Sequence, residues 1–86
     1  MAYHIYILQS IQTGRLYIGQ TANLVSRLDR HNAGSVPSTK PYRPWNLIFS
    51  KEFLTRTEAI KEENRLKKLK SKDYILKYIS AKASRL

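Results

Sequence analysis

The sequence predicts a small α+β domain, in which a three-stranded, mostly antiparallel sheet is flanked by three helices in the order β-β-α-β-α-α. Near the N-terminus, apolar and polar residues alternate in two short stretches separated by turn residues, which predicts a β-hairpin. Later stretches begin with capping residues and continue with apolar residues at helical spacing. Because the 86 residues contain no internal repeat or low-complexity linker, we expect a single domain over residues 1–86.

The hairpin is expected from Tyr3–Gln9 and Arg15–Gly19, joined by the turn residues SIQTG. If Tyr6 pairs opposite Gly19, both Tyr6 and Tyr17 lie on one face of the sheet, whereas a slip of one residue would separate them. Either tyrosine could also be an ordinary half-buried strand aromatic. The register of this hairpin therefore decides whether the two phenols meet.

A helix is predicted from the stretch TANLVSRLDRHNAG, starting at Thr21 or Asn23 and ending at Gly34. Its expected apolar stripe consists of Leu24, Val25 and Leu28. At about 100° per residue, Arg27 and His31 lie together on one edge of this stripe, within reach of both the core boundary and solvent. His31 could alternatively serve only as a favourable cation at the helix C-terminus.

The remaining chain predicts a loop, a third strand and two helices. Three prolines in SVPSTKPYRPWN exclude a continuous helix or a central strand there. The residues NLIFSKEFL are expected to form the strand, and TRTE at 55–58 is a capping box that begins a helix extending to about Lys70. A last helix is expected to begin at Ser71 or Asp73.

The charge balance indicates a polyanionic partner. Sixteen Lys and Arg residues against six Asp and Glu residues give a net charge of +10, and nucleic acid is favoured over a merely soluble basic surface. The chain lacks cysteine, which excludes disulfides and thiolate metal sites. No run approaches the roughly 18 apolar residues that a membrane span requires, so we expect a cytoplasmic protein without membrane contact. The sequence does not indicate any protein partner.

One acidic residue on the capped helix lies where carboxylates are rare. Glu63 follows Ile60 by three residues and precedes Leu66 by three, which sets it within the inward, apolar face. The apolar residues that define this face are Ala59, Ile60, Leu66 and Leu69. A buried carboxylate must be ion-paired, hydrogen-bonded or bound to a metal. An outward ion pair with Lys67 explains the spacing equally well, and Glu62 at the rim of the same face is a further alternative.

Several kinds of catalytic site are excluded or disfavoured by what the sequence lacks. Two histidines cannot form a three-histidine zinc site, no phosphate-binding glycine loop or serine nucleophile motif is present, and six scattered carboxylates do not favour a two-metal nuclease site. One carboxylate, an arginine, a histidine and two tyrosines on a basic domain suit one-metal phosphodiester cleavage. In that chemistry Glu63 would hold a divalent cation, Arg27 would stabilise the charge gathering on the phosphorus, and a tyrosine would orient or deprotonate the attacking water.

Several segments resemble the GIY-YIG nuclease superfamily, in particular its small stand-alone, single-domain bacterial members. HIY and YIG, with ten residues between Tyr6 and Tyr17, look like its paired motif, and LVSRLDRHN looks like the helix that follows. STKPYRPWNLIFSKEF and TEAIKEENRLKKLK resemble the later segments of the small members. The resemblance therefore spans nearly the whole chain, roughly residues 3–80.

The resemblance implies a divalent-metal-dependent endonuclease that hydrolyses DNA, with Mg²⁺ or Mn²⁺ as its cofactor. Arg27 is then the catalytic arginine, His31 the polar residue one turn later, and Glu63 rather than Glu62 the metal ligand. Gly19 would leave backbone room beside a tyrosine. Nothing resembles a separate sequence-reading module, so we expect selectivity for DNA structure rather than for base sequence. Further phosphate contacts are expected from Lys40, Arg43, Lys67, Lys68 and Lys70.

Two departures from the superfamily keep an alternative open. His4 stands where the superfamily's name has glycine, at a position that varies among the small members. Many members also carry an asparagine some way after the metal-binding glutamate, whereas here the only asparagine beyond Asn46 is Asn64, which adjoins Glu63. The alternative to an enzyme is a non-catalytic nucleic-acid-binding module that retains the fold and the basic face.

Overall fold

The computed structural model describes residues 2–69 and 71–83, and these residues form three strands and three α-helices. The strands are β1 (Tyr3–Ser10), β2 (Leu16–Thr21) and β3 (Trp45–Phe53). The helices are α1 (Leu24–Ala33), α2 (Arg56–Lys68), α3 (Lys72–Ala83) and a short 3-10 helix, η1 (Lys40–Tyr42). The predicted α+β fold and its order β-β-α-β-α-α are confirmed. None of the helices in the described part of the chain is long and apolar enough to cross a membrane.

Strand β1 lies in the centre of the sheet and pairs antiparallel with both neighbours, in the order β2-β1-β3. In the hairpin, Tyr6 pairs with Gly19 and Leu8 pairs with Tyr17. Because alternate residues of a strand share a face, this register, the first of the two that the sequence left open, brings both tyrosines to the same side of the sheet. Strand β2, which carries Tyr17 and Gly19, is an edge of the sheet.

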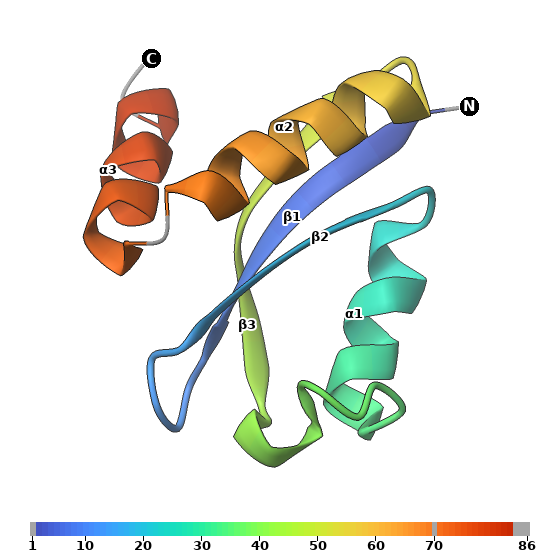
Figure 1. Cartoon of the computed structure of the whole chain (residues 1–86). Coiled ribbons are helices and arrows are strands. Elements are labelled where there is room, and N and C mark those ends of the chain that lie inside the picture. The colour runs from blue at the N-terminus through green and yellow to red at the C-terminus, as the bar shows by residue number, and fades with distance from the viewer. Residues whose placement is uncertain (1, 70, 84–86) are drawn as a thin grey trace.

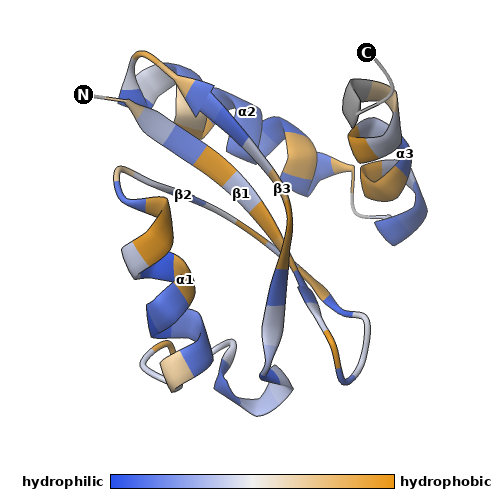
Figure 2. Cartoon of the chain, turned by 180° about the vertical axis from the view of Figure 1, so that it is seen from behind, coloured by the Kyte–Doolittle hydropathy of each residue, from blue (hydrophilic) through white to orange (hydrophobic). Residues whose placement is uncertain are grey.

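The helices cover the two faces of the sheet separately (Figure 1). Helix α2 packs against the strands on one face with α3 beside it, and α1 and η1 lie on the other. Alternation along β1 divides the core accordingly: Ile5 and Ile7 face α2 and α3, whereas Tyr6 and Leu8 face α1. In Figure 2, apolar residues run along the central strand β1, while α1 and α2 mix polar and apolar residues around their circumference.

Helix α1 begins and ends at capping residues. Asn23 is the N-cap, because its side chain accepts a hydrogen bond at 3.0 Å from a backbone N–H three residues later, and Gly34 ends the helix with a φ of 82°. Leu24 and Leu28 pack on the sheet, but Val25 is 73% exposed, so its expected place in the apolar stripe was wrong. The line that faces the sheet runs through positions 24, 28 and 31 at helical spacing, and Val25 lies about 100° away from it.

Helices α2 and α3 also begin close to the predicted positions. The Thr55 hydroxyl accepts from the Glu58 N–H at 3.2 Å and donates to the Glu58 carboxylate at 3.0 Å, which caps α2. Helix α2 ends at Lys68, slightly before the expected end. Helix α3 follows Ser71, whose carbonyl accepts from a backbone N–H in the first turn at 3.1 Å. Asp73, the other predicted start, therefore lies within the first turn.

The buried face of α2 is narrower than the sequence suggests. Ala59 and Leu66 are buried in the core on the same side of the helix. Ile60 and Leu69 are 38% and 37% exposed, so their assignment to the inward face was wrong. They flank the contact, because a helix touches a sheet along a single stripe of residues spaced by three and four. Glu63 lies between Ala59 and Leu66 on that stripe.

Truncating Leu66 to alanine should lower the free energy of unfolding by about 2–5 kcal/mol, because the change leaves a cavity between α2 and the sheet. Val25→Ala is the matched control, since Val25 is mostly exposed; it should change the free energy of unfolding by no more than about 0.7 kcal/mol. Urea unfolding followed by circular dichroism measures both values. Equal losses in the two variants would contradict the burial of Leu66.

Candidate active site

Tyr6 is the centre of the candidate site. It is 1% exposed, and its phenol crosses the edge strand β2 at Gly19. A Cβ atom on residue 19 would lie 2.5 Å from the Tyr6 hydroxyl oxygen and 2.6 Å from Cζ, closer than real Cβ atoms approach other groups. The phenol can therefore occupy this place only because residue 19 is glycine. The ring of Tyr17 lies beside it, with the two ring centroids 6.2 Å apart.

His31 reaches Tyr6 from α1 and is itself buried. Its Nε2 lies 3.0 Å from the Tyr6 hydroxyl, and its Nδ1 lies 2.8 Å from the Thr39 hydroxyl. We assign the Thr39 hydroxyl as the donor to the Val36 carbonyl, 3.3 Å away, and therefore as the acceptor of a hydrogen bond from His31 Nδ1–H. His31 Nε2 is then left without a proton, and the Tyr6 O–H donates to it.

Thr39 is a site residue that the sequence did not indicate. It is 1% exposed, and its carbonyl also accepts from the Trp45 indole N–H at 2.9 Å, which ties the proline-rich loop to the core. Its contact with His31 joins a loop to a helix, so helical or strand periodicity in the sequence cannot predict it. The sequence offers one related signal, the tryptophan at the end of KPYRPW, because a large aromatic residue in a loop is suited to anchor it on the core.

Burial and charge set the protonation of these groups. Burial, with a smaller contribution from Tyr17, raises the pKa of Tyr6 to about 12, while the charge of Arg27 and a hydrogen bond from it oppose the rise. Burial also lowers the pKa of His31 below its ordinary value of 6.5, and the charges of Arg27 and Arg30 lower it further. Near neutral pH, Tyr6 is therefore a protonated donor and His31 an uncharged acceptor.

Glu63 acts on Tyr6 from the other layer of the fold. Its carboxylate raises the pKa of Tyr6, as the smallest of the effects on that group. Groups from both helical layers can affect the pKa of Tyr6, because α2 packs over β1 and β2 and the Tyr6 phenol crosses β2 at Gly19. The Glu63 side chain is 15% exposed and forms an ion pair with Lys67 at 2.9 Å. The inward placement and the Lys67 pair, which are alternatives in the sequence, are thus present together.

Glu62 is engaged elsewhere, between α2 and α3. Its carboxylate accepts from Arg65 at 2.9 Å and from the Tyr78 hydroxyl at 2.5 Å. Burial raises the pKa of Glu62, but these hydrogen bonds outweigh burial and hold the pKa below its ordinary value. Of the two adjacent carboxylates, Glu63 is the one that affects the Tyr6 hydroxyl.

The Glu63 carboxylate offers the kind of oxygen ligand that a hard divalent cation takes. Within residues 2–69 and 71–83, no three His, Cys, Asp or Glu side chains gather into a metal cage. Mg²⁺ does not require one, since it keeps several waters and commonly binds through one or two carboxylates and substrate phosphates. On the α2 side of β2, the amide oxygen of Gln20 is also buried without a hydrogen-bond partner, so hard oxygen atoms are available there. Lys67, whose side chain is 54% exposed, would have to release Glu63.

The basic residues expected to contact phosphate lie in two places. Lys40 and Arg43 line a surface hollow beside η1. Lys67 is held in its ion pair, and Lys68 is exposed in the last turn of α2. Lys70 lies outside the described residues.

The family of the chain follows from comparison with known protein families. Residues 2–78 match the GIY-YIG catalytic domain, a stretch that includes all three strands and every residue of the candidate site. The chain belongs to the GIY-YIG family. GIY-YIG domains form a nuclease superfamily, so the predicted family is confirmed, and with it the general class of nucleases.

Relatives of this GIY-YIG domain carry the name UPF0213. The UPF0213 protein OB0043 of Oceanobacillus iheyensis is 35% identical over 68 residues, which cover 78% of each chain. The UPF0213 protein SH2523 of Staphylococcus haemolyticus is 34% identical over 68 residues, 78% of this chain and 83% of the relative. The solution NMR structure of the UPF0213 protein BH0048 of Bacillus halodurans aligns over 99% of this chain and 89% of its own, with 27% identity and a TM-score of 0.62.

Replacing Gly19 with alanine should displace the Tyr6 phenol, because the added Cβ would collide with it. We expect a destabilisation of about 1–3 kcal/mol, measured by chemical unfolding, and altered NMR shifts of the His31 imidazole. In a Tyr6→Leu background, where no phenol crosses residue 19, the same substitution should have a much smaller effect. An equal effect in both backgrounds would show that the phenol is not the cause.

His31 should titrate below its ordinary pKa of 6.5, because burial and nearby arginines disfavour the imidazolium. A proton then binds the unfolded chain more readily than the folded one. This contribution to stability should be fully present above the unfolded pKa of about 6.5 and lost as the pH falls through the lower folded value. Nitrogen-15 NMR of the imidazole measures the pKa and should report the Nδ1–H tautomer.

Thr39→Val tests the tautomer in the same experiment, because it removes the acceptor of His31 Nδ1–H with little change in volume. The variant should populate both tautomers. Thr39→Ser, which keeps a hydroxyl, should retain Nδ1–H. A pure Nδ1–H tautomer in Thr39→Val would rule out the assigned role of Thr39.

Proposed function

We propose that this protein is a divalent-metal-dependent endonuclease that hydrolyses DNA phosphodiester bonds through a catalytic cluster. The cluster consists of Tyr6, Tyr17, Arg27, His31 and Glu63. The observation that carries the proposal is the environment of the buried Tyr6 phenol: His31 Nε2 lies 3.0 Å from its hydroxyl oxygen and the Tyr17 ring centroid lies 6.2 Å from its own. The charges of Arg27 and Glu63 also affect the pKa of Tyr6. Buried titratable groups under opposed charges are typical of sites that move protons. Membership of a nuclease family supplies the class of reaction.

Tyr6 and His31 would together deprotonate the attacking water. With a pKa of about 12, Tyr6 is protonated near neutral pH and is not a base on its own. It can pass its proton to the unprotonated Nε2 of His31 while it takes a proton from water, so that the positive charge ends on the imidazole. The lowered pKa of His31 keeps Nε2 free to accept that proton at neutral pH.

Arg27 and Tyr17 would complete the surroundings of the reacting phosphate. The guanidinium of Arg27 is permanently charged, and beside the Tyr6 phenol it would stabilise the negative charge that develops on the phosphate oxygens. The ring centroid of Tyr17 lies 4.8 Å from that of His31 and 6.2 Å from that of Tyr6. The ring of Tyr17 therefore packs beside both proton-carrying groups.

Glu63 would hold Mg²⁺ or Mn²⁺. When bound, the cation would supply positive charge to a phosphate oxygen and to the leaving alkoxide. Glu63 offers a single, largely buried carboxylate, and Lys67 provides its countercharge at 2.9 Å in the absence of a metal. Exchange of the ammonium for a metal would keep the carboxylate paired, which avoids the penalty of a lone buried charge.

The charge of the whole chain favours a nucleic acid as the substrate. A net charge of +10 attracts a phosphate backbone without reading base sequence. The described residues form the GIY-YIG fold and no additional DNA-reading module. Selectivity would then come from DNA structure, such as flaps or breaks, that brings a strand to the edge of β2.

A non-catalytic nucleic-acid-binding module is the second candidate function. The observation that favours it is the ion pair between Glu63 and Lys67, which occupies the carboxylate that a metal needs. If Glu63 has only this structural role, its replacement by alanine leaves nucleic-acid affinity unchanged, and no variant or metal produces cleavage.

Cleavage assays on nicked, flapped and branched DNA, with Mn²⁺ or with EDTA, distinguish the two functions. Glu63→Gln and Arg27→Ala should each lower the cleavage rate by about 10²–10³-fold, and EDTA should abolish cleavage. Tyr6→Phe should also be strongly impaired, because the ring remains but the proton that it would relay to His31 is gone.

Glu52→Gln is the matched control for Glu63→Gln, because Glu52 is an exposed carboxylate on β3 outside the catalytic cluster. This variant should cleave at the wild-type rate. Cleavage that persists in both Glu63→Gln and Arg27→Ala would overturn the proposed site. Salt-dependent binding without cleavage under any condition would establish the second function instead.

A further inference from the structure

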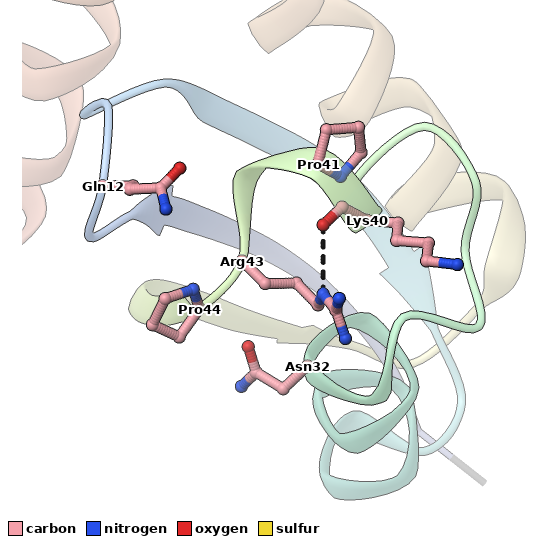
Figure 3. Close-up of a pocket in the computed structure, with 6 residues that line it drawn as sticks. All are labelled: Gln12, Asn32, Lys40, Pro41, Arg43 and Pro44. Atoms are coloured by element: carbon pink, nitrogen blue, oxygen red, sulfur yellow. Dashed lines mark hydrogen bonds between the residues drawn. The ribbon is translucent and has the colours of Figure 1, made fainter.

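A surface hollow beside η1 carries positive charge and lies outside the catalytic cluster. It is lined by the turn between β1 and β2, the end of α1 and the η1 loop (Figure 3): Gln12, Asn32, Lys40, Pro41, Arg43 and Pro44. Two of these side chains are cationic, two are amides and none is acidic. We propose that this hollow binds a backbone phosphate of the same nucleic acid whose scissile phosphate lies at the catalytic cluster.

Arg43 is oriented for such a contact before any ligand arrives. Its Nε donates to the Lys40 carbonyl at 3.0 Å, and Figure 3 shows the guanidinium between this carbonyl and Asn32. The guanidinium also lies against the backbone of Gly34, where an added Cβ would be 2.8 Å from Nη1. Within the described residues no carboxylate forms an ion pair with it. Its terminal N–H groups are thus available for a phosphate, which a guanidinium binds with two parallel hydrogen bonds.

The competing explanation is that Arg43 only stabilises the C-terminus of α1, where cations are favourable. Two of the last four carbonyls of α1 already have backbone partners, however. The Arg30 carbonyl accepts from the Ser35 N–H at 3.0 Å, and the His31 carbonyl accepts from the Gly34 N–H at 3.3 Å. Any cation would suit the helix dipole, whereas two-pronged phosphate binding requires a guanidinium. Arg43→Lys therefore separates the two roles.

The hollow adjoins the catalytic cluster through two pairs of neighbouring residues. Asn32 follows His31 in α1, and Lys40 follows Thr39 in the loop, while His31 and Thr39 are hydrogen-bonded to each other. Successive Cα atoms are about 3.8 Å apart, so the hollow begins one residue behind the proton path on both elements. The hollow therefore borders the two residues, His31 and Thr39, that hold the proton path.

The inference depends on the proposed function for its ligand, nucleic acid, and not for cleavage. Its test is the binding of fluorescently labelled flapped DNA to Glu63→Gln protein in EDTA, measured by anisotropy over a range of salt concentrations. Adding Arg43→Ala should weaken binding several-fold and reduce the slope of log K against log salt by about 0.9 for the lost phosphate contact. Arg43→Lys should remain clearly weaker than arginine.

Lys77→Ala is the matched control, because Lys77 is an exposed cation on α3, in the layer opposite the hollow. It lowers the net charge equally but should leave affinity and salt slope close to those of the parent. Backbone NMR spectra provide the second readout: DNA should shift the amides of Asn32, Lys40 and Arg43. Inorganic phosphate should shift them only at far higher concentration than DNA does.

The outcomes separate this inference from the proposed function. Equal weakening by Arg43→Ala and Lys77→Ala would overturn the hollow as a phosphate site, even if the wild-type protein cleaves DNA. Full activity of Arg43→Lys in binding would assign Arg43 to the helix terminus and overturn it too. Tighter binding of inorganic phosphate than of DNA would identify a free-anion site instead. Arg43-dependent binding by a protein that never cleaves would support the hollow and refute the proposed hydrolysis.

Discussion

The passage of the Tyr6 phenol across Gly19 is the constraint on which the rest of the site depends. A side chain at residue 19 would fill the space that the phenol occupies. Because residue 19 is glycine, the phenol of the central strand can extend over the edge strand β2. At that edge it comes under the influence of His31 from one helical layer and Glu63 from the other. The hairpin register has to be held to the residue, because a slip by one would turn Tyr17 and Gly19 away.

The helices are fixed in rotation by contacts that take no part in the proposed chemistry. Ala59 and Leu66 are buried along one side of α2. The hydrogen bond from the Tyr78 hydroxyl holds the Glu62 side chain toward α3. Glu63 is thereby left to face the strands. In a chain of 86 residues, α1 and α2 thus each contribute both to the core and to the candidate site.

Much of this arrangement could be predicted from the sequence because it depends on short-range patterns. Capping residues mark the helix starts, the turn residues mark the hairpin, and the spacing of Arg27 and His31 places them on one edge of α1. Thr39 could not be predicted, since its contact with His31 depends on how a proline-rich loop folds back on the core. Helical spacing alone also did not decide whether Glu62 or Glu63 faces the site. The choice between them depends on the rotation of α2, which packing against the sheet and α3 determines.

The ion pair between Glu63 and Lys67 within α2 has a consequence for folding. In some small metal-binding domains the metal is needed for folding, because the binding site does not form without it. Here a single acid has an ammonium from its own helix one turn away, at 2.9 Å. The charge of Glu63 is therefore balanced within α2 itself, and the fold does not need a divalent ion to neutralise it.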